Sequence, residues 1–329
     1  MNGEFCYSHS MKISVTTFYK FFPQSEEQVK ARREALFKLG NELELKGLLL
    51  IGTEGVNSTL SGAEDKVNQF KGHLLDILQL DNMTFKDSYA DRIPFRRWKV
   101  KVRDEIVTIG RPGMVPAAEK NHHLSPEEWN KALQEEDVIC IDTRNKYETE
   151  LGKFKSAIDP EIDDFQEFSS FVENSNIDKD KKILIYCTGG IRCEKGILEL
   201  NKLGYNNVYQ LDGGILNYLK QYPEQEFDGE CFVFDHRVSV DQNLNPSQRW
   251  HLCPHCGNPA DQLIQCKQCS MDEYVCVHCL EQKQDKPEVE TCSKNCAHHF
   301  ELGHKTTKPH VDTLVKRGKL DKLKLSAQP

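Results

Sequence analysis

The stretch that most constrains the fold runs from residue 182 to residue 196. Residues 183–186 are apolar or aromatic, which predicts a short strand buried on both faces, as in a parallel sheet with helices on either side. Cys187 ends this strand, and residues 193–203 then carry leucine and isoleucine at helical spacing before Gly204 ends the helix. The pattern predicts an α/β domain with a cysteine between the carboxyl end of a strand and the start of a helix.

This position predicts a reactive thiolate. Backbone N–H groups of the loop and of the first helical turn converge on such a site, and the helix dipole adds positive potential. Gly189 and Gly190 suit a tight loop with inward-pointing amides, and we expect Arg192 to help hold the sulfur. We therefore expect Cys187 to have a lowered pKa and to act as a nucleophile and persulfide carrier; the alternative is a buried structural cysteine. Cys193 is a candidate resolving thiol, or a cysteine that only packs.

The size of the loop limits what the thiolate attacks. Only residues 188–191 separate Cys187 from Arg192, a shorter loop than a cysteine phosphatase needs to encircle a phosphate. A ring this small suits a single extra sulfur atom better than a phosphoryl group. The stretch resembles the active-site loop of the rhodanese family, in which the cysteine carries a persulfide.

Two further motifs extend this resemblance over residues 123–223. One is Asp142-x-Arg144-x3-Glu148, in which we expect the aspartate and the arginine to support the neighbouring loop through a charged hydrogen-bond pair. The other is Leu-Asp-Gly-Gly-Ile-x-x-Tyr at 211–218. The chain departs from the family pattern at 153–154, where Lys-Phe replaces a common Gly-His pair, and at Tyr218, where a Trp is common.

Residues 11–105 predict a ferredoxin-like α+β domain with the order βαββαβ. Near its end, six cations occur without an acid between them, and on a strand their alternation with Trp98, Val100 and Val102 places the charges on one face and the apolar side chains inward. Such a face can bind an RNA backbone, or it can be a solvated edge that discourages strand pairing. The candidate substrate-binding residues are Arg92, Arg96, Arg97, Lys99, Lys101 and Arg103.

Eight of the 13 cysteines form Cys-x2-Cys or Cys-x3-Cys pairs near the C-terminus. Each pair presents two thiolates to one tetrahedral ion, so four pairs predict two structural zinc sites of four cysteines each. The spacing leaves open whether consecutive or alternate pairs combine. The candidate ligands are Cys253, Cys256, Cys266, Cys269, Cys276, Cys279, Cys292 and Cys296.

The composition of the chain further limits which partners and which location we expect for this protein. The net charge of −8 argues against a generally basic nucleic-acid binder, so no DNA partner is expected and RNA contacts must use a local patch. The sequence contains no apolar run long enough to span a membrane and no signal-peptide pattern at 1–10, which predicts a cytoplasmic protein without membrane partners. It shows no flavin or haem motif, and it does not indicate an oligomeric state.

Taken together, the motifs resemble the tRNA uridine(34) hydroxylase family of rhodanese-domain proteins. Besides the loop around Cys187, the match rests on Gly-Thr-Glu-Gly-Val-Asn-Ser-Thr at 52–59, the basic segment at 92–101 and Cys-Phe-Val-Phe-Asp-x-Arg at 231–237. The resemblance implies an oxidoreductase that makes 5-hydroxyuridine at the wobble position of tRNA with molecular oxygen, binds the anticodon loop and needs the cysteine at 187. A sulfurtransferase using the same cysteine and a non-catalytic zinc adaptor are the alternatives.

The predicted organisation has five parts. They are a ferredoxin-like domain (11–105), a linker (106–122), a rhodanese domain (123–223), a connection with the cysteine-rich zinc region (224–304) and a basic, flexible tail (305–329).

Overall fold

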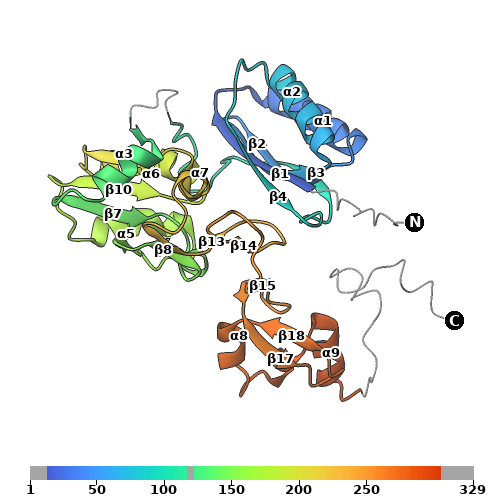
Figure 1. The fold of residues 1–329 in the computed structure, drawn as a ribbon. Coiled ribbons are helices and arrows are strands. Elements are labelled where there is room, and N and C mark those ends of the chain that lie inside the picture. Colours follow the sequence, from blue (N-terminus) through green and yellow to red (C-terminus); the bar gives the residue numbers. More distant parts are fainter. Residues whose placement is uncertain (1–12, 117–121, 305–329) are drawn as a thin grey trace, which may run out of the picture. The chain divides into compact units, whose positions relative to one another are not determined.

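The computed structural model describes residues 13–116 and 122–304 (Figure 1). The chain divides into two compact units, the first ending at Ser247 and the second beginning at Gln248. The basic tail predicted at 305–329 lies outside the described residues. Among the helices that the structure describes, none is both long and apolar enough to cross a lipid bilayer.

The first unit starts with a five-stranded sheet in the order β4-β1-β3-β2-β5. The first four strands along the chain pair antiparallel in the ferredoxin-like order, and β5 joins the edge parallel to β2. Both helices cover the same face of the sheet (Figure 1). The predicted βαββαβ order is therefore confirmed, with these bounds: β1 (Ile13–Phe21), α1 (Glu26–Glu42), β2 (Lys46–Gly52), β3 (Gly55–Gly62), α2 (Glu64–Leu78), β4 (Phe85–Ala90) and β5 (Trp98–Val102).

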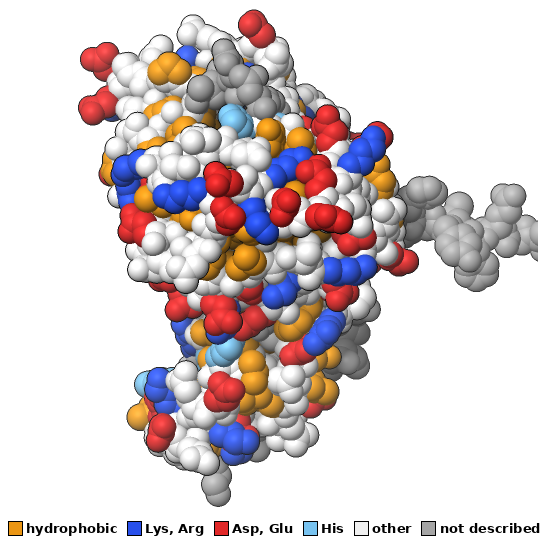
Figure 2. Space-filling model, turned by 90° about the vertical axis from the view of Figure 1, so that its left-hand side faces the viewer, with side chains coloured by type: hydrophobic (Ala, Val, Ile, Leu, Met, Phe, Trp, Pro, Cys, Tyr) orange, Lys and Arg blue, Asp and Glu red, His pale blue; other side chains and the backbone are white. Residues whose placement is uncertain are grey.

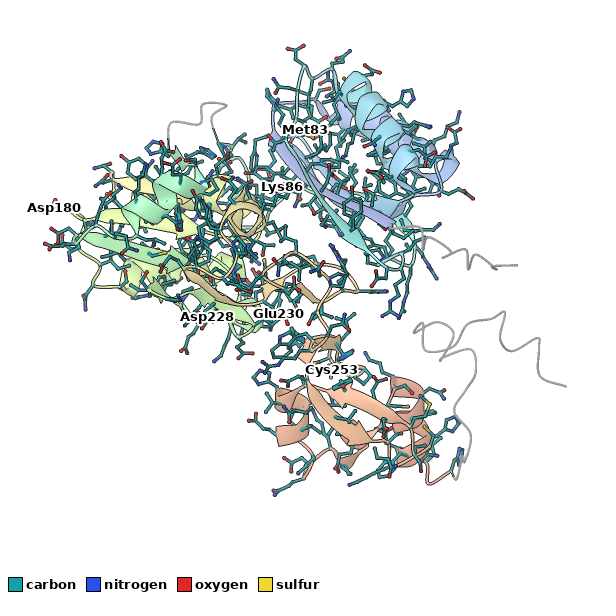
Figure 3. All side chains as sticks on the ribbon, viewed as in Figure 1. Met83, Lys86, Asp180, Asp228, Glu230 and Cys253 are labelled. Atoms are coloured by element: carbon teal, nitrogen blue, oxygen red, sulfur yellow. The ribbon has the colours of Figure 1, made fainter. Side chains whose placement is uncertain are left out.

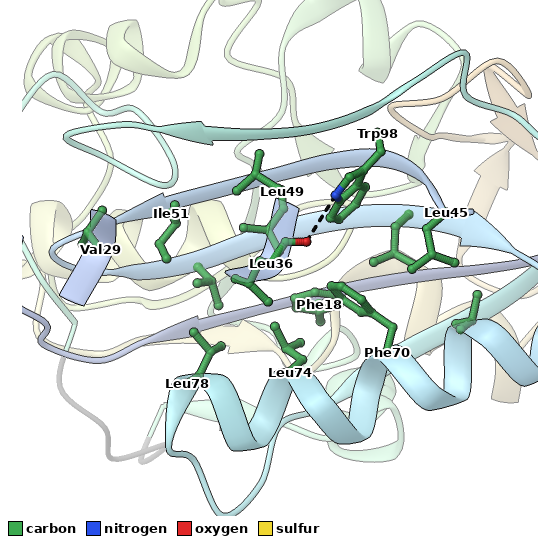
Figure 4. Packing of buried hydrophobic residues seen from close by; sticks show 14 residues of the cluster. Phe18, Val29, Leu36, Leu45, Leu49, Ile51, Phe70, Leu74, Leu78 and Trp98 are labelled. Carbon is green, nitrogen blue, oxygen red and sulfur yellow. Dashed lines mark hydrogen bonds between the residues drawn. The ribbon is translucent and has the colours of Figure 1, made fainter. Parts of the chain in front are cut away.

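An apolar core lies between this sheet and its two helices. Figure 4 shows Phe70 and Leu74 of α2 reaching toward the sheet. Trp98 of the sheet donates a hydrogen bond from Nε1 to the carbonyl of Leu36, on α1, at 3.3 Å. The rings of Phe70 and Trp98 meet edge to face with centroids 5.6 Å apart, a favourable geometry for aromatic pairs. Because one face is packed in this way, alternate residues of each strand must point to the other face.

One prediction for the basic strand is wrong. Trp98 and Val100 are buried as expected, but Val102 is 50% exposed. The alternation gives Val102 the same face as its two apolar neighbours, yet it is the last residue of β5 and belongs to no buried cluster. Period-two patterns predict which way a side chain points, and they carry no information on how far the covering helices extend.

The first unit continues with a parallel sheet in the order β6-β11-β10-β7-β9. Ile183 and Ile185 of the central strand enter one apolar core, while Leu184 and Tyr186 enter another on the opposite face. This confirms a parallel sheet buried on both sides. Its strands are β6 (His123–Leu124), β7 (Val138–Asp142), β9 (Ala157–Ile158), β10 (Lys182–Tyr186) and β11 (Val208–Leu211).

Short helices connect these strands. The first, α3, begins with a capping box, in which Ser125 and Glu128 each accept a hydrogen bond from the other's backbone N–H. The helices are α3 (Pro126–Ala132), α4 (Lys146–Thr149), α5 (Phe168–Asn174), α6 (Ile191–Lys202) and α7 (Gly214–Gln221), with a 3₁₀ turn η1 (Phe165–Glu167).

Two small pairings complete the first unit. Strand β12 (Phe227–Gly229) pairs with β8 (Gly152–Phe154), and β13 (Cys231–Phe232) pairs with β14 (Ser239–Val240). The segment predicted as a linker at 106–122 packs at its start, because Ile106 and Ile109 are buried.

The second unit is built from short elements around its cysteines. It contains two antiparallel pairs, β15 with β16 and β17 with β18. Its largest buried apolar cluster consists of three cysteines with Ala260, Val275 and Val289, which is a small core for a folded unit. The elements are β15 (His251–Leu252), β16 (Pro259–Ala260), β17 (Gln262–Gln265), β18 (Asp272–Val275), α8 (Val277–Glu281), a 3₁₀ turn η2 (Pro287–Glu290) and α9 (Lys294–Glu301).

Candidate active site

Cys187 follows the central strand β10, and helix α6 begins four residues later. The backbone N–H of Gly190 donates to its Sγ at 3.0 Å. Gly190 has φ +101°, and a Cβ there would lie 2.9 Å from the hydroxyl of Tyr19, so a side chain at this position is disfavoured twice. The loop thus aims an amide at the sulfur, as the paired glycines predicted.

The start of helix α7 holds the same loop from behind. The N–H groups of Ile215 and Leu216 donate to the carbonyls of Cys187 and Thr188 at 3.0 and 3.2 Å. A Cβ on Gly214 would lie 2.4 Å from the Cys187 carbonyl oxygen, so only glycine permits this approach. The Gly-Gly motif at the start of α7 therefore fixes the backbone of the loop at 187–191, which we call the Cys187 loop.

The sulfur of Cys187 is ionised more easily than an ordinary thiol. Burial alone would raise its pKa, but the S–H of Cys193, the charge of Arg192 and the N–H groups of Arg192 and Gly189 hold the pKa well below its usual range. Burial and the neighbouring thiolate raise the pKa of Cys193, so Cys193 keeps its proton and donates it. Cys187 is only 1% exposed.

The guanidinium of Arg192 does not bond to the sulfur. It donates two hydrogen bonds to the carboxylate of Glu148, at 2.8 and 2.6 Å, and both side chains are buried. Arg192 therefore acts on Cys187 through its charge and its backbone N–H. Glu148 belongs to the motif visible in the sequence, but no role was predicted for it; its spacing from Arg144 was the available signal.

Asp142 and Arg144 form a buried pair beside this loop. Arg144 donates from Nε and Nη2 to Asp142, with a shortest distance of 2.6 Å, and from Nη2 to the Gly152 carbonyl at 2.6 Å. Both side chains are fully buried. The pair ties the end of β7 to the following turn, the arrangement expected for a loop support.

Cys187 lines a cavity of about 360 Å³. Its walls include Thr17, Tyr19 and Asn57 of the N-terminal sheet, the Cys187 loop, and the segment from 233 to 244 that contains Phe234 and Arg237. No sequence pattern indicated that the N-terminal sheet contributes to this site. Because Cys187 is so well covered, a reactant reaches it through this cavity.

Tyr19 connects the two sheets at the cavity wall. Its hydroxyl donates to Glu194 at 2.8 Å, and Glu194 also contacts Nε2 of His123 at 3.1 Å. Burial, and next the charge of Glu194, raise the pKa of Tyr19 well above its usual value, so the phenol stays protonated. Lys86, labelled in Figure 3, lies with its ammonium nitrogen 4.7 Å from the Tyr19 ring centroid.

A second connection between the sheets is a buried group of three charges. The ammonium nitrogen of Lys195, on α6, lies 2.9 Å from Glu54 and 2.7 Å from Glu105. Glu54 lies in the turn between β2 and β3, and the Lys195 side chain is fully buried. A buried ammonium requires such partners, since an unpaired charge in the interior is costly.

The segment after β13 carries an exposed aromatic side chain to the cavity. Phe234 is 56% exposed although it lines the cavity, and the Arg192 guanidinium lies 5.7 Å from its ring centroid. Arg237 pairs with Asp235 at 2.6 Å and donates to the Ser88 hydroxyl of β4 at 2.9 Å. An accessible ring at a cavity wall can stack on a planar ligand.

The six predicted cations are all exposed, and none of them lines the cavity itself. Lys99 and Lys101 pair in register with Leu48 and Leu50, which line the cavity, so the two lysines continue that face of the sheet. Arg92 and Arg96 lie near His236, whose pKa is lowered by burial and then by the charges of Arg96 and Arg92. Arg97 and Arg103 flank β5. On the face shown in Figure 2, acidic and basic side chains are interspersed, so any RNA contact depends on local groups like these.

The eight paired cysteines form two tetrads in the second unit. Cys253, Cys256, Cys276 and Cys279 form one, and Cys266, Cys269, Cys292 and Cys296 form the other. The first pair along the chain thus combines with the third and the second with the fourth, which is a cross-brace. Cys253 is labelled in Figure 3.

The geometry of both tetrads fits a tetrahedral ion. Contacting sulfurs lie 3.5 to 3.8 Å apart, as between Cys253 and Cys279 (3.8 Å) and between Cys269 and Cys292 (3.6 Å). A tetrahedral ion with metal–sulfur bonds of about 2.3 Å holds its ligands about 3.8 Å apart, and four thiolates favour zinc among the common metals. The two tetrads could each hold one metal ion.

Three family models match successive parts of the chain. They are the UPF0176 acylphosphatase like domain at residues 13–106, the Rhodanese-like domain at 125–221 and the Rhodanase C-terminal at 228–297. The parallel sheet around Cys187 therefore belongs to a rhodanese-like domain, which confirms that part of the predicted fold.

Curated relatives match most of the chain. A protein of Bdellovibrio bacteriovorus is 51% identical over 296 residues, covering 89% of this chain and 83% of the relative. A Legionella pneumophila protein (strain Corby) is 44% identical over 71% of this chain and 92% of its own length, and one from Picosynechococcus sp. is 39% identical over 81% and 90%. Each of the three is named tRNA uridine(34) hydroxylase.

Proposed function

Since the chain belongs to the tRNA uridine(34) hydroxylase family, as its motifs predicted, we propose that it hydroxylates the wobble uridine of tRNA at C5. It is an oxidoreductase that modifies tRNA, with molecular oxygen as co-substrate. The two alternatives, a sulfurtransferase and a non-catalytic zinc adaptor, are not favoured by these relatives. A tRNA substrate also fits the expected cytoplasmic location.

One observation carries this proposal: the stabilised thiolate of Cys187 opens into a cavity shared by the two sheets. Its volume of about 360 Å³ is at the lower end of the range for small-molecule sites, roughly 300–1,000 Å³. That space suits one nucleoside rather than a stacked duplex. A base in the anticodon loop is accessible for such capture, because single-stranded bases are easily unstacked.

The proposed chemistry starts with the sulfur. Sγ of Cys187 adds to C6 of the uracil, and the electron pair of the C5–C6 bond moves toward C5 and O4. C5 takes one atom of molecular oxygen and loses its proton when the sulfur–C6 bond breaks. The other oxygen atom leaves as water, using two electrons and two protons from a two-electron reductant.

The protein groups support each part of this sequence. Gly189, Gly190 and Arg192 stabilise the thiolate before attack and after its release. Cys193 is the thiol beside the reacting sulfur, which suits it to condense with a sulfenic acid formed on Cys187, giving a disulfide and releasing water. Asp142 and Arg144 hold the neighbouring turn in place.

The tRNA backbone binds at the edge of the N-terminal sheet in this proposal. Lys99 and Lys101 continue the cavity face, and Arg92 and Arg96 lie near the segment that carries Phe234. Arg97 and Arg103 extend the basic surface beyond the ends of β5. Contacts to phosphates position a nucleic acid, while the small cavity selects the base.

The proposal also includes two bound zinc ions. Each would be held by one cysteine tetrad, where it would supply structure rather than reactivity, because four thiolates leave no position open for substrate. The second unit buries little apolar surface, so metal binding would contribute much of its folding free energy.

The test uses purified protein with an unmodified tRNA transcript that carries uridine at position 34. After incubation with ¹⁸O₂ and a thiol reductant, nucleoside mass spectrometry should detect 5-hydroxyuridine containing the heavy isotope. Omitting oxygen, or using Cys187→Ala, should abolish the product. A thiolated nucleoside, or hydroxyuridine whose oxygen comes from water, would refute the proposal.

A further inference from the structure

We propose that Asn57 reads the N3–H of the target base, so that the cavity accepts uracil and rejects cytosine. This inference rests on the proposed function, and it assigns the base selectivity of the same cavity to one residue of the N-terminal sheet.

Asn57 is placed at the cavity by strand register. It lies on β3 opposite Tyr19 of β1 and opposite Leu50 of β2, and all three side chains line the cavity together with Cys187. Directly paired residues on antiparallel strands have Cβ atoms about 4.5–5.5 Å apart, so Asn57 lies beside Tyr19. The hydroxyl of Tyr19 in turn reaches Gly190 of the Cys187 loop. A base held against Asn57 would therefore occupy the space that leads to the thiolate.

The orientation of the Asn57 amide is determined by its neighbours. Its Nδ2 donates to the carbonyl of Ile106 at 2.9 Å. Turning the amide over would bring two oxygen atoms together, so the carboxamide oxygen must point away from Ile106. Among the residues that the structure describes, that oxygen has no hydrogen-bond partner, and it is not among the enclosed polar atoms.

The group that orients Asn57 is itself fixed. Ile106 is fully buried, and its N–H donates to Glu54 at 2.6 Å. Glu54 in turn lies 2.9 Å from the buried ammonium of Lys195. A chain of buried contacts thus holds the acceptor in one position before a base arrives, which is how supporting contacts give a binding group its precision.

A second amide in the cavity provides a contrast. Asn145 donates from Nδ2 to the Tyr147 hydroxyl at 3.3 Å, but its oxygen is enclosed by protein and has no partner in the described part of the chain. An enclosed oxygen cannot reach a ligand without rearrangement. Of the two asparagines that line the cavity, only Asn57 presents an accessible acceptor.

A fixed acceptor distinguishes the two pyrimidines. Uracil carries a donor at N3, which would satisfy the Asn57 oxygen. Cytosine carries a lone pair at N3, which would face that oxygen and leave two acceptors without a proton between them. Sites built to hydrogen-bond a substrate N–H reject analogues that lack it by large factors.

The test compares anticodon-loop substrates that differ only at position 34: uridine, 3-methyluridine and cytidine. Product is measured as kcat/KM with the purified full-length protein. The wild type should act on 3-methyluridine and cytidine at least about 100-fold less well than on uridine. Asn57→Ala should lose roughly 10- to 100-fold on uridine and should prefer uridine over 3-methyluridine by only a few-fold.

Two further variants act as controls. Asn57→Asp keeps an acceptor oxygen but replaces the donor to the Ile106 carbonyl with a second oxygen, so it should act more slowly on uridine than the wild type while still preferring uridine over 3-methyluridine. Asn41→Ala, at an exposed helix position whose side chain caps the Phe37 carbonyl, should match the wild type on all three substrates. Equal rates of the wild type on uridine and 3-methyluridine would overturn the inference without any variant. It would also fail if Asn57→Ala kept the full preference. No product from uridine with the wild type would instead refute the proposed function.

Discussion

The two units of this protein use cysteine in opposite ways. In the first unit, one thiolate faces backbone amides, a thiol and a nearby guanidinium, and these groups stabilise its charge without blocking it. In the second unit, contacting sulfurs of each tetrad lie 3.5 to 3.8 Å apart, an arrangement that could hold a metal ion. The ligands around a sulfur, rather than the residue type, decide whether it reacts or holds structure.

The largest effect should come from replacing the isolated sulfur. Cys187→Ser should lower hydroxylation by about 10³-fold or more, because a hydroxyl in the same place is not ionised and is a far weaker nucleophile. Its thermal unfolding temperature should stay close to that of the wild type. Cys140→Ala, a change at another buried cysteine of the same sheet, is the matched control and should remain active. Full activity of Cys187→Ser would remove the distinction between the two kinds of cysteine.

Replacing one cysteine of a tetrad should lower metal binding and the stability of the second unit. Cys276→Ser should reduce bound zinc from two ions per chain toward one, since three thiolates no longer fill a four-cysteine site. Metal analysis measures the loss, and limited proteolysis should show new cleavage after residue 248. The alkylation rate of Cys187 should not change. Unchanged zinc content and protease resistance would argue against a metal at this tetrad.

Removing the two lysines beside the cavity should weaken substrate binding. The double variant Lys99→Ser with Lys101→Ser should raise KM for tRNA by roughly tenfold with little change in kcat. The slope of log affinity against log salt should fall by about 1.4, or 0.7 for each single-strand phosphate that the variant no longer neutralises. Lys38→Ser, on the helix side of the same domain, is the control and should behave like the wild type. An unaltered salt slope would place the tRNA backbone elsewhere.

The smallest effect concerns the proton that Cys193 shares with the thiolate. Because its S–H stabilises the ionised form, Cys193→Ala should raise the pKa of Cys187. A small alkylating reagent should then reach its maximal rate at a higher pH than with the wild type, and Cys193→Ser should lie between the two. If the wild type itself titrates like a free cysteine, the stabilised thiolate is absent and the proposed chemistry fails.

Local patterns predicted the parts of this protein that lie close together in sequence. The stretch that contains the Cys187 loop is uninterrupted, so its strand, its cysteine and its helix could all be inferred from spacing. Each cysteine pair was equally visible, whereas the pairing of pairs was not, because it depends on how the chain returns on itself. The cross-brace is therefore a finding of the structure.

Contacts between distant residues could not be predicted in this way. Tyr19 meets Glu194 across 175 positions, and Glu148 meets Arg192 across 44. No periodicity relates such residues, so the N-terminal wall of the cavity and the partner of Arg192 were missed. The prediction that Val102 is buried was wrong for a related reason, since strand alternation does not show where the helices stop covering the sheet.

Because Lys195 is buried against Glu54 and Glu105, the rhodanese-like part of the first unit depends on the N-terminal part for its stability. A rhodanese segment cut from the chain at residue 123 would keep the ammonium group and lose Glu54 and Glu105, both of its counter-charges. We therefore expect this segment to be less stable alone than in the whole chain, because an unpaired charge in the interior is costly. Shuffling it onto another protein would require that Lys195 be redesigned as well.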